Sequence, residues 1–292
     1  LNDPTVMDGR YVFTFYPDPP APDVVDVVDA CPIQSTATTV HQYGIDYIEI
    51  NCRGKHTLDF QGVHTVNLMP EKAYSGDFSY WSNQGDLSNP TLTRQFDFTG
   101  VRGPITLSYR TWYSIEEDWD YLYVEASTNG EDWTILGTPS CTMYDPTGNS
   151  YGCGYTGDTN GWIEESVDLS AYAGQQVSIR FDYITDTAVT MQGFLVDDIR
   201  IDAIQYFDDF EEADSTWMAD GFVRVENQLP QTYRVTLIQI GNETTVEPVI
   251  LDDQMRAKIP FTIGSGVDRI ILVVSGTTRF TREQAAYSYT IR

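Results

Sequence analysis

The sequence predicts an all-β protein built from two β-sandwich domains. Short runs of apolar, β-branched and aromatic residues recur along the chain between clusters of Gly, Asn, Asp and Pro, which is typical of strands joined by turns. No window of useful length shows the 3.6-residue apolar period of an amphipathic helix. With 292 residues, 41% of them hydrophobic, the chain is long enough for two substantial cores.

The first 72 residues are expected to contribute few strands. In residues 1–35, Tyr11–Phe15 predicts an N-terminal strand, and the Pro- and Asp-rich stretch from Pro17 onward predicts an extended linker, because Pro is kept out of helices and central strands. The segment 36–72 holds too few strands to stand alone, since an isolated hairpin is marginal in water. We therefore expect it to pack on a neighbouring domain.

Residues 73–203 predict a jelly roll, and residues 204–292 a smaller immunoglobulin-like sandwich. The first block is the richest in Trp and Tyr. The expected strands of the two blocks are 94–98, 105–113, 121–127, 177–183 and 193–201, then 233–240, 246–251, 257–261, 269–275 and 287–291.

Charge narrows the classes of partner. The chain has 17 Lys and Arg against 43 Asp and Glu, a net charge of −26, so its field repels nucleic acid and anionic lipid and attracts cations. High net charge also keeps an extracellular protein soluble, and the charge alone does not choose between solubility and cation binding. No stretch approaches the roughly 20 apolar residues of a spanning helix, so we expect no membrane insertion.

Four cysteines form two local pairs in the sequence, Cys31 with Cys52 and Cys141 with Cys153. Three connectivities are formally open, and we expect the local one. Two disulfides indicate an oxidising, extracellular compartment. A zinc site is the competing interpretation, although neither pair has C-x2-C spacing; free buried thiols are a third.

The motifs of zincin peptidases and of P-loop enzymes are missing. Neither His-Glu-x-x-His nor a P-loop occurs, and the three histidines are His41, His56 and His64, so we expect no enzyme activity from this chain. A pair of carboxylates on facing strands could still hydrolyse a glycosidic bond, and 43 acids supply such pairs by coincidence.

The acids indicate a structural calcium site instead. In the strand 193–201 successive side chains point to opposite faces, so one of Asp197 and Asp198 faces inward, where a carboxylate needs a cation, an Arg or several donors. Calcium takes six to eight oxygens from carboxylates and carbonyls. Ser75 and Asp77 of the turn at 73–77, with Glu71, are the expected further ligands.

A second calcium site is predicted at the run Glu116, Glu117, Asp118 and Asp120, which crowds four carboxylates into five residues. Such crowding is repulsive unless the carboxylates are solvated or bind a metal. Solvated surface acids are the alternative at both places.

A family resemblance rests on segments spread over the middle block. They are Ala73–Gly76, Tyr80–Ser82, Leu92–Phe98, Glu116–Tyr121, Ser127–Gly130, Gly161–Trp162, Asp168–Gln175, Tyr183–Asp186 and Gly193–Ile199. Together they resemble the C-terminal, non-peptidase part of the immune inhibitor A family of secreted bacterial metallopeptidases. The resemblance implies a jelly roll similar to MAM-type adhesion modules, whose Asp-Asp strand and Ser-Gly turn commonly hold a structural cation. The catalytic zinc domain of the family is missing here.

The sequence thus predicts a secreted, non-catalytic, calcium-stabilised module for adhesion, binding or structure, whose partner is an extracellular protein, a glycan or another copy of itself. One alternative is the accessory C-terminal fragment of a secreted zinc metallopeptidase. Another is a subunit of an extracellular fibre or surface layer, with Tyr11–Phe15 as donor strand. Glycan binding would use exposed Trp and Tyr faces, although most of these rings should be core.

Overall fold

The computed structural model describes residues 23–292, and within them the secondary structure is almost entirely β. Two 3-10 helices, η2 at Ser170–Tyr172 and η3 at Asp202–Ile204, are the helical elements of this part of the chain. Neither has the length or apolar character needed to cross a membrane. The predicted strand Tyr11–Phe15 lies outside the described residues.

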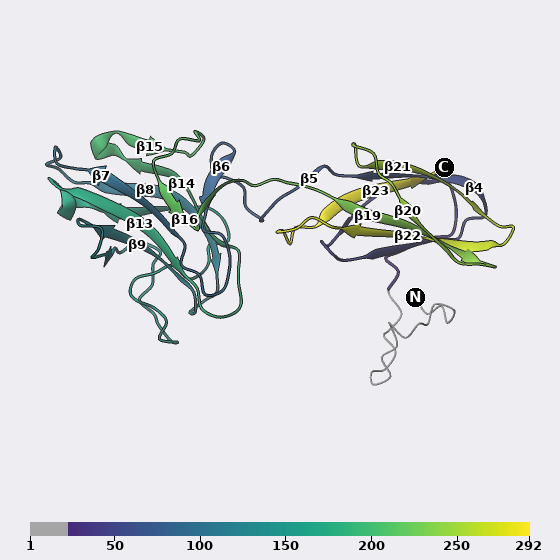
Figure 1. The fold of residues 1–292 in the computed structure, drawn as a ribbon, viewed down its shortest axis with the longest axis horizontal. Helices are drawn as coiled ribbons and strands as arrows, with labels where there is room; N and C mark the ends of the chain where they lie inside the picture. Colours follow the sequence, from purple (N-terminus) through teal and green to yellow (C-terminus); the bar gives the residue numbers. More distant parts are fainter. Residues whose placement is uncertain (1–22) are drawn as a thin grey trace. The chain divides into compact units, whose positions relative to one another are not determined.

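The chain divides into two compact units (Figure 1). The central unit comprises Asn67–Leu229, and the terminal unit combines Pro230–Arg292 with the chain up to Val66. Purple strands from the start of the described chain and yellow strands from its end therefore belong to the same unit.

The central unit contains two sheets. One has the order β11-β8-β14-β6-β17, with β12 also paired to β8 and β15 to β14; the other has the order β10-β9-β13-β7-β16. The strands of the first sheet are β6 (Phe78–Trp81), β8 (Thr106–Ile115), β11 (Gly157–Asp158), β12 (Ile163–Asp168), β14 (Gly193–Ile201), β15 (Tyr206–Asp208) and β17 (Val223–Glu226). Those of the second are β7 (Thr91–Asp97), β9 (Tyr121–Ser127), β10 (Thr134–Ile135), β13 (Gln176–Ile184) and β16 (Met218–Asp220).

Alternating apolar residues of these strands form one core between the sheets. Val177, Ile179 and Phe181 of β13 are buried, and Ser178 and Arg180 between them are partly exposed. The Phe181 ring lies 5.8 Å from the ring of Phe194 on β14, in the other sheet. The predicted jelly-roll sandwich is confirmed, and the start of β13 shows the period-two pattern of a strand with one buried face.

The predicted boundary at residue 204 is wrong. Strands β15, β16 and β17 pair with β14, β7 and β6 of the central unit. Phe210, Trp217 and Phe222 are buried in the central core, so burial of these three rings holds the segment 204–229 in the jelly roll rather than in the second sandwich.

The terminal unit is also a two-sheet sandwich. Its sheets have the orders β1-β3-β22-β19-β20 and β2-β23-β4-β21. The strands are β1 (Asp26–Val28), β2 (Ile33–Val40), β3 (Asp46–Ile50), β4 (Gly54–Gly62), β19 (Tyr233–Gly241), β20 (Thr245–Val249), β21 (Arg256–Ile263), β22 (Val267–Gly276) and β23 (Ala285–Ile291). A separate two-stranded sheet joins β5 (Thr65–Val66) and β18 (Leu229–Pro230).

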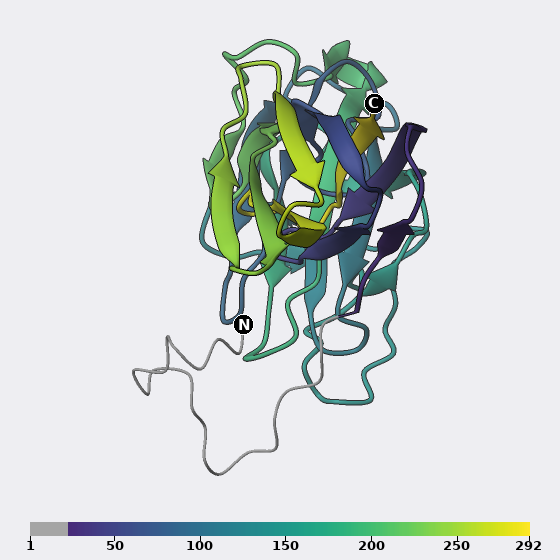
Figure 2. The same ribbon diagram turned by 90° about the vertical axis from the view of Figure 1, so that its right-hand side faces the viewer.

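Strands from both ends of the sequence complete this sandwich. β2 and β4 flank β23, and β3 pairs with β22; Figure 2 shows the purple strands among the yellow ones. Part of the expected linker 1–35 is therefore regular structure, because Val28 is buried in the core of the terminal unit and Ile33 begins β2. The expected segment 36–72 is divided between the units at Val66.

Candidate metal site

Asp197 is the inward-facing member of the Asp197–Asp198 pair. It is fully buried on β14. Its Oδ2 accepts hydrogen bonds from the backbone N–H groups of Tyr74 and Ser75, at 2.9 and 3.2 Å, and its Oδ1 accepts one from the backbone N–H of Asp198, at 2.8 Å. Burial raises the pKa of Asp197 to about 7, although the bonds from Ser75 and Asp198 oppose that rise.

Asp198 turns away from the regular strand. Its φ is +47°, and the pairing of β14 with β8 shifts register between Asp197 and Arg200, as in a β-bulge. Its Oδ1 accepts a hydrogen bond from Ser75 Oγ at 2.6 Å. The structure thus brings Asp197, Asp198 and Ser75 of the first predicted site together, from residues more than 120 positions apart.

The other two predicted ligands meet different partners. The backbone N–H groups of Asp77 and Phe78 donate to Glu211 Oε1 at 2.9 and 2.8 Å. The backbone oxygen of Glu71 accepts a hydrogen bond from Asn227 Nδ2. Glu211 was missed by the sequence analysis, and the only local trace of it is Gly76, where a Cβ would lie 2.3 Å from the Glu211 carboxylate.

The Asp197 carboxylate therefore serves as a hydrogen-bonded staple between the turn at 73–76 and β14. Three of its acceptor positions are filled by backbone donors, and such donors compensate a buried carboxylate without a cation. These hydrogen bonds account for the buried Asp197 carboxylate of the first predicted site without a metal ion.

The second predicted site is partly assembled, with one ligand that the prediction lacked. Oxygen atoms of Glu116, Asp120 and Asp186 lie within 4.8 Å of one another. We call these three residues the acidic triad. Glu116 and Asp120 come from the loop between β8 and β9, and Asp186 follows β13. Glu117 and Asp118 are not members of the triad.

Asp120 is held firmly in the acidic triad. It is 1% exposed, and its Oδ1 accepts a hydrogen bond from the backbone N–H of Asp186 at 2.8 Å, while Oδ2 lies 3.5 Å from Tyr183 Oη. Burial raises the pKa of Asp120 to about 6, and the negative charges of Asp186 and Glu116 add to the rise.

Glu116 carries the feature that points to a ligand. Its Oε2 is buried and has no hydrogen-bond partner among the described residues. Burial raises the pKa of Glu116, as do the charges of Asp186 and Asp86. A hard divalent cation such as calcium would satisfy this oxygen and relieve the mutual repulsion of the triad.

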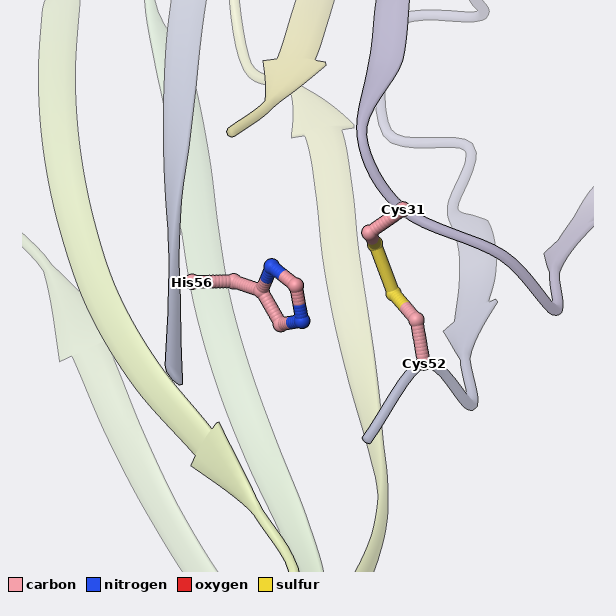
Figure 3. A group of neighbouring side chains, drawn as sticks. All are labelled: Cys31, Cys52 and His56. Atoms are coloured by element: carbon pink, nitrogen blue, oxygen red, sulfur yellow. A yellow bond between two sulfur atoms is a disulfide. The ribbon is translucent and has the colours of Figure 1, made fainter. Parts of the chain in front are cut away.

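A second group of potential metal ligands, Cys31, Cys52 and His56, lies in the terminal unit (Figure 3). The two sulfur atoms form a disulfide, so they cannot bind zinc as thiolates. Cys141 and Cys153 form the other disulfide. Both predicted local pairs are confirmed, and the zinc and free-thiol interpretations are wrong.

Comparison with known proteins places the chain in a family. A family profile described as "Immune inhibitor A-like, MAM domain" matches residues 45–227. The "Pre-pro-metalloprotease PrtV" of Vibrio cholerae is 36% identical over 155 residues, which are 52% of this chain and 16% of that protein. "Immune inhibitor A" of Bacillus thuringiensis is 32% identical over 172 residues, 56% of this chain and 24% of that protein.

A more distant relative is "Bacillopeptidase F" of Bacillus subtilis, 28% identical over 135 residues, 44% of this chain and 8% of that protein. The matched part thus spans less than a quarter of each of these relatives. Because the profile covers more than half of the chain and includes the acidic triad and the Asp197 staple, the protein belongs to the immune inhibitor A-like MAM domain family.

Proposed function

We propose that this chain is the non-catalytic accessory region of a secreted metallopeptidase related to immune inhibitor A, and that it binds a partner of that enzyme. The observation that carries this proposal is the extent of the matches. The aligned part is 16% of the length of a relative whose printed name includes "metalloprotease", and 24% of the length of "Immune inhibitor A". The printed sequence contains no His-Glu-x-x-His, the zinc-binding motif of zincin peptidases.

The structural chemistry supports a binding role outside the cell. Two disulfides stabilise the sandwiches, which suits an oxidising compartment. The Asp197 carboxylate accepts hydrogen bonds from the backbone of the turn at 73–76. The Asp120 carboxylate of the acidic triad accepts one from the backbone of Asp186. Both carboxylates therefore hold loops in place. An extracellular adhesion role independent of any peptidase remains the alternative.

The reading frame upstream of Leu1 tests this proposal. We expect it to encode His-Glu-x-x-His in frame with the chain. A frame that opens directly before Leu1 with a signal peptide, and with no such motif, would leave the chain as an independent secreted module and would contradict the accessory role.

We also propose that the acidic triad binds a structural calcium ion. The support is the buried, unpartnered Glu116 Oε2 beside two further carboxylates. Glu116, Asp120 and Asp186 would supply the protein ligands, and the ion would fix the loop 116–120 to the loop after β13. The first predicted site is the weaker candidate, because backbone N–H groups already satisfy Asp197.

A further inference from the structure

Three loops of the central unit gather at one end of its sandwich. They are residues 82–90 between β6 and β7, residues 116–120 between β8 and β9, and residues 185–192 between β13 and β14. The strand pairing fixes this placement, because Gly193 is opposite Ser114, Ile184 is opposite Tyr121 and Asp182 is opposite Thr91. We call this end the loop end.

The disulfide-closed loop 141–153 joins the loop end from the side. It covers the outer face of β9, where the backbone N–H of Tyr151 donates to Tyr123 Oη at 2.9 Å and the two rings lie 6.2 Å apart. Thr147 Oγ1 donates to the backbone oxygen of Asp118, and Asn149 Nδ2 donates to that of Trp119 at 3.3 Å.

Loop 141–153 is held in one conformation by several independent contacts. Besides the disulfide, Thr142 and Gly154 exchange backbone hydrogen bonds, and Asp145 Oδ1 accepts hydrogen bonds from the N–H groups of Gly148 and Ser150. A loop fixed in this way loses little conformational entropy when a partner binds.

The loop end and loop 141–153 expose several large apolar side chains. Tyr144 is 66% exposed and Tyr151 is 75% exposed. Trp119, Met143, Leu87 and Val189 are exposed on the same loops. Rigid Tyr and Trp rings give a large contact area at low entropic cost, and exposed patches of them mark interaction sites.

The charge of these loops is entirely of one sign. Residues 82–90, 116–120, 141–153 and 185–192 contain no Lys, Arg or His, whereas 116–120 contains four carboxylates and each of the other three loops contains one. Glu116, Asp120 and Asp186 belong to the acidic triad, whereas Asp86, Glu117 and Asp145 are exposed. Exposed acids beside aromatic rings suit cationic groups, which pair with the acids and stack on the rings. The same unit already stacks Arg180 over Trp133, at 4.0 Å from the ring centroid.

We propose that the loop end, with loop 141–153, is a docking surface for a basic polypeptide segment, whose Lys or Arg heads pair with the carboxylates while their stems lie on Trp119, Tyr144 and Tyr151. This proposal names the partner chemistry of the central unit and does not depend on a peptidase domain elsewhere. Anionic partners are disfavoured by the charge.

The test measures binding of a short synthetic peptide of alternating Arg and Ala residues, with a peptide of alternating Glu and Ala as its counterpart. Calcium is present throughout, so that a metal effect is not mistaken for a peptide effect. The variant W119A/Y144A/Y151A removes the rings. Its matched control is M218A/I250A/F280A, which truncates side chains exposed on other surfaces.

A second pair of variants separates the local charge from the overall charge of the protein. D86N/E117Q removes two carboxylates from the loop end, and E243Q/E247Q removes two exposed carboxylates from the terminal unit. This pair also keeps the proposal testable if the triple aromatic variant unfolds, which a thermal melt would show.

We expect the Arg-Ala peptide to bind and the Glu-Ala peptide not to bind. The aromatic variant should weaken binding by about ten-fold or more, as for buried interface anchors, and D86N/E117Q by several-fold, while both controls stay within about two-fold. Equal losses in a variant and its control, or no binding of the Arg-Ala peptide while neutral glycans bind, would overturn the proposal.

Discussion

The carboxylate of Asp120 accepts a hydrogen bond from the backbone N–H of Asp186 at 2.8 Å. This bond joins two loops that are 66 residues apart in the sequence, and one carboxylate oxygen each of Asp120, Asp186 and Glu116 lie within 4.8 Å of one another. The metal proposal and the docking proposal both concern this end of the central unit, and both depend on these loops being fixed in place.

Calcium is expected to stabilise the protein through the acidic triad. Millimolar calcium should raise the midpoint of the thermal melt and chelator should lower it, with about 2.7 kcal/mol of stabilisation when the ion is at 100 times its Kd. Elemental analysis of the purified protein should find calcium. E116Q should remove most of the calcium response, because it replaces a charged ligand by a neutral one.

The matched control for this variant is E117Q, since Glu117 is adjacent in the chain but outside the triad. It should keep the full calcium response. Equal calcium responses in E116Q, E117Q and the unmodified protein would show that the triad is a solvated cluster of acids.

When chelator is present, lowering the pH should raise the free energy of unfolding through protonation of Asp120. Its pKa is about 6 in the folded protein against an ordinary value of 3.8, so the folded state binds more protons between these values. The stability this adds is complete below the unfolded pKa and is lost as pH rises through about 6, with a slope of at most about 1.4 kcal/mol per pH unit for one proton.

Urea unfolding between pH 4 and 8 measures this effect. D120N should lose the corresponding part of the pH dependence and keep the part caused by general charge repulsion. Calcium should act in the opposite sense, since its affinity falls when its ligands are protonated. Identical pH profiles for D120N and the unmodified protein would contradict the assignment.

Replacing Asp197 should cost more stability than any single hydrogen bond. D197A leaves the part-buried N–H groups of Tyr74, Ser75 and Asp198 without their acceptor, and each such loss costs about 1 kcal/mol or more. We expect a total of about 3–5 kcal/mol in urea unfolding. The exposed Asp202, just after the same strand, supplies the control D202A, which should stay within about 0.5 kcal/mol. A cost below about 1 kcal/mol for D197A would show that the staple is dispensable.

The unit boundaries predict which fragments fold. A fragment of residues 67–229 should unfold cooperatively, because it contains both sheets of the jelly roll. Residues 204–292 alone should not fold, because β21, β22 and β23 would lack their partners β4, β3 and β2. A control that joins residues 23–66 to 230–292 through a flexible linker should restore cooperative unfolding. A cooperative melt of 204–292 by itself would contradict these boundaries.

Much of the fold was predictable because it is encoded locally. Strand β14 at Gly193–Ile201 has the bounds predicted from its apolar residues, and both disulfides join cysteines that are close in sequence. The assignment of the segment 204–229 was not predictable in this way, because it depends on pairing between strands such as β17 and β6, far apart in the chain. A local sequence pattern predicts that a segment forms a strand, but it does not predict which strand it pairs with.

Some residues of the candidate sites were likewise predictable from the sequence and others were not. Ser75, Asp197 and Asp198 were predicted because the Ser-Gly turn and the Asp-Asp strand are visible in the sequence. Asp186 and Glu211 were missed because the contacts that place them in these sites cross long separations in the sequence: Asp186 meets Asp120, 66 residues before it, and Glu211 meets Asp77, 134 residues before it. An isolated carboxylate in a loop carries no sign of the backbone that it will contact.

Hydrolysis of casein by the purified chain tests most directly the central claim that this is a binding module without catalysis. With zinc or calcium added, we predict no release of acid-soluble fragments above the buffer blank, while a zinc peptidase assayed alongside releases them. Hydrolysis that follows the chain through successive chromatography steps and is abolished by chelator would contradict the claim.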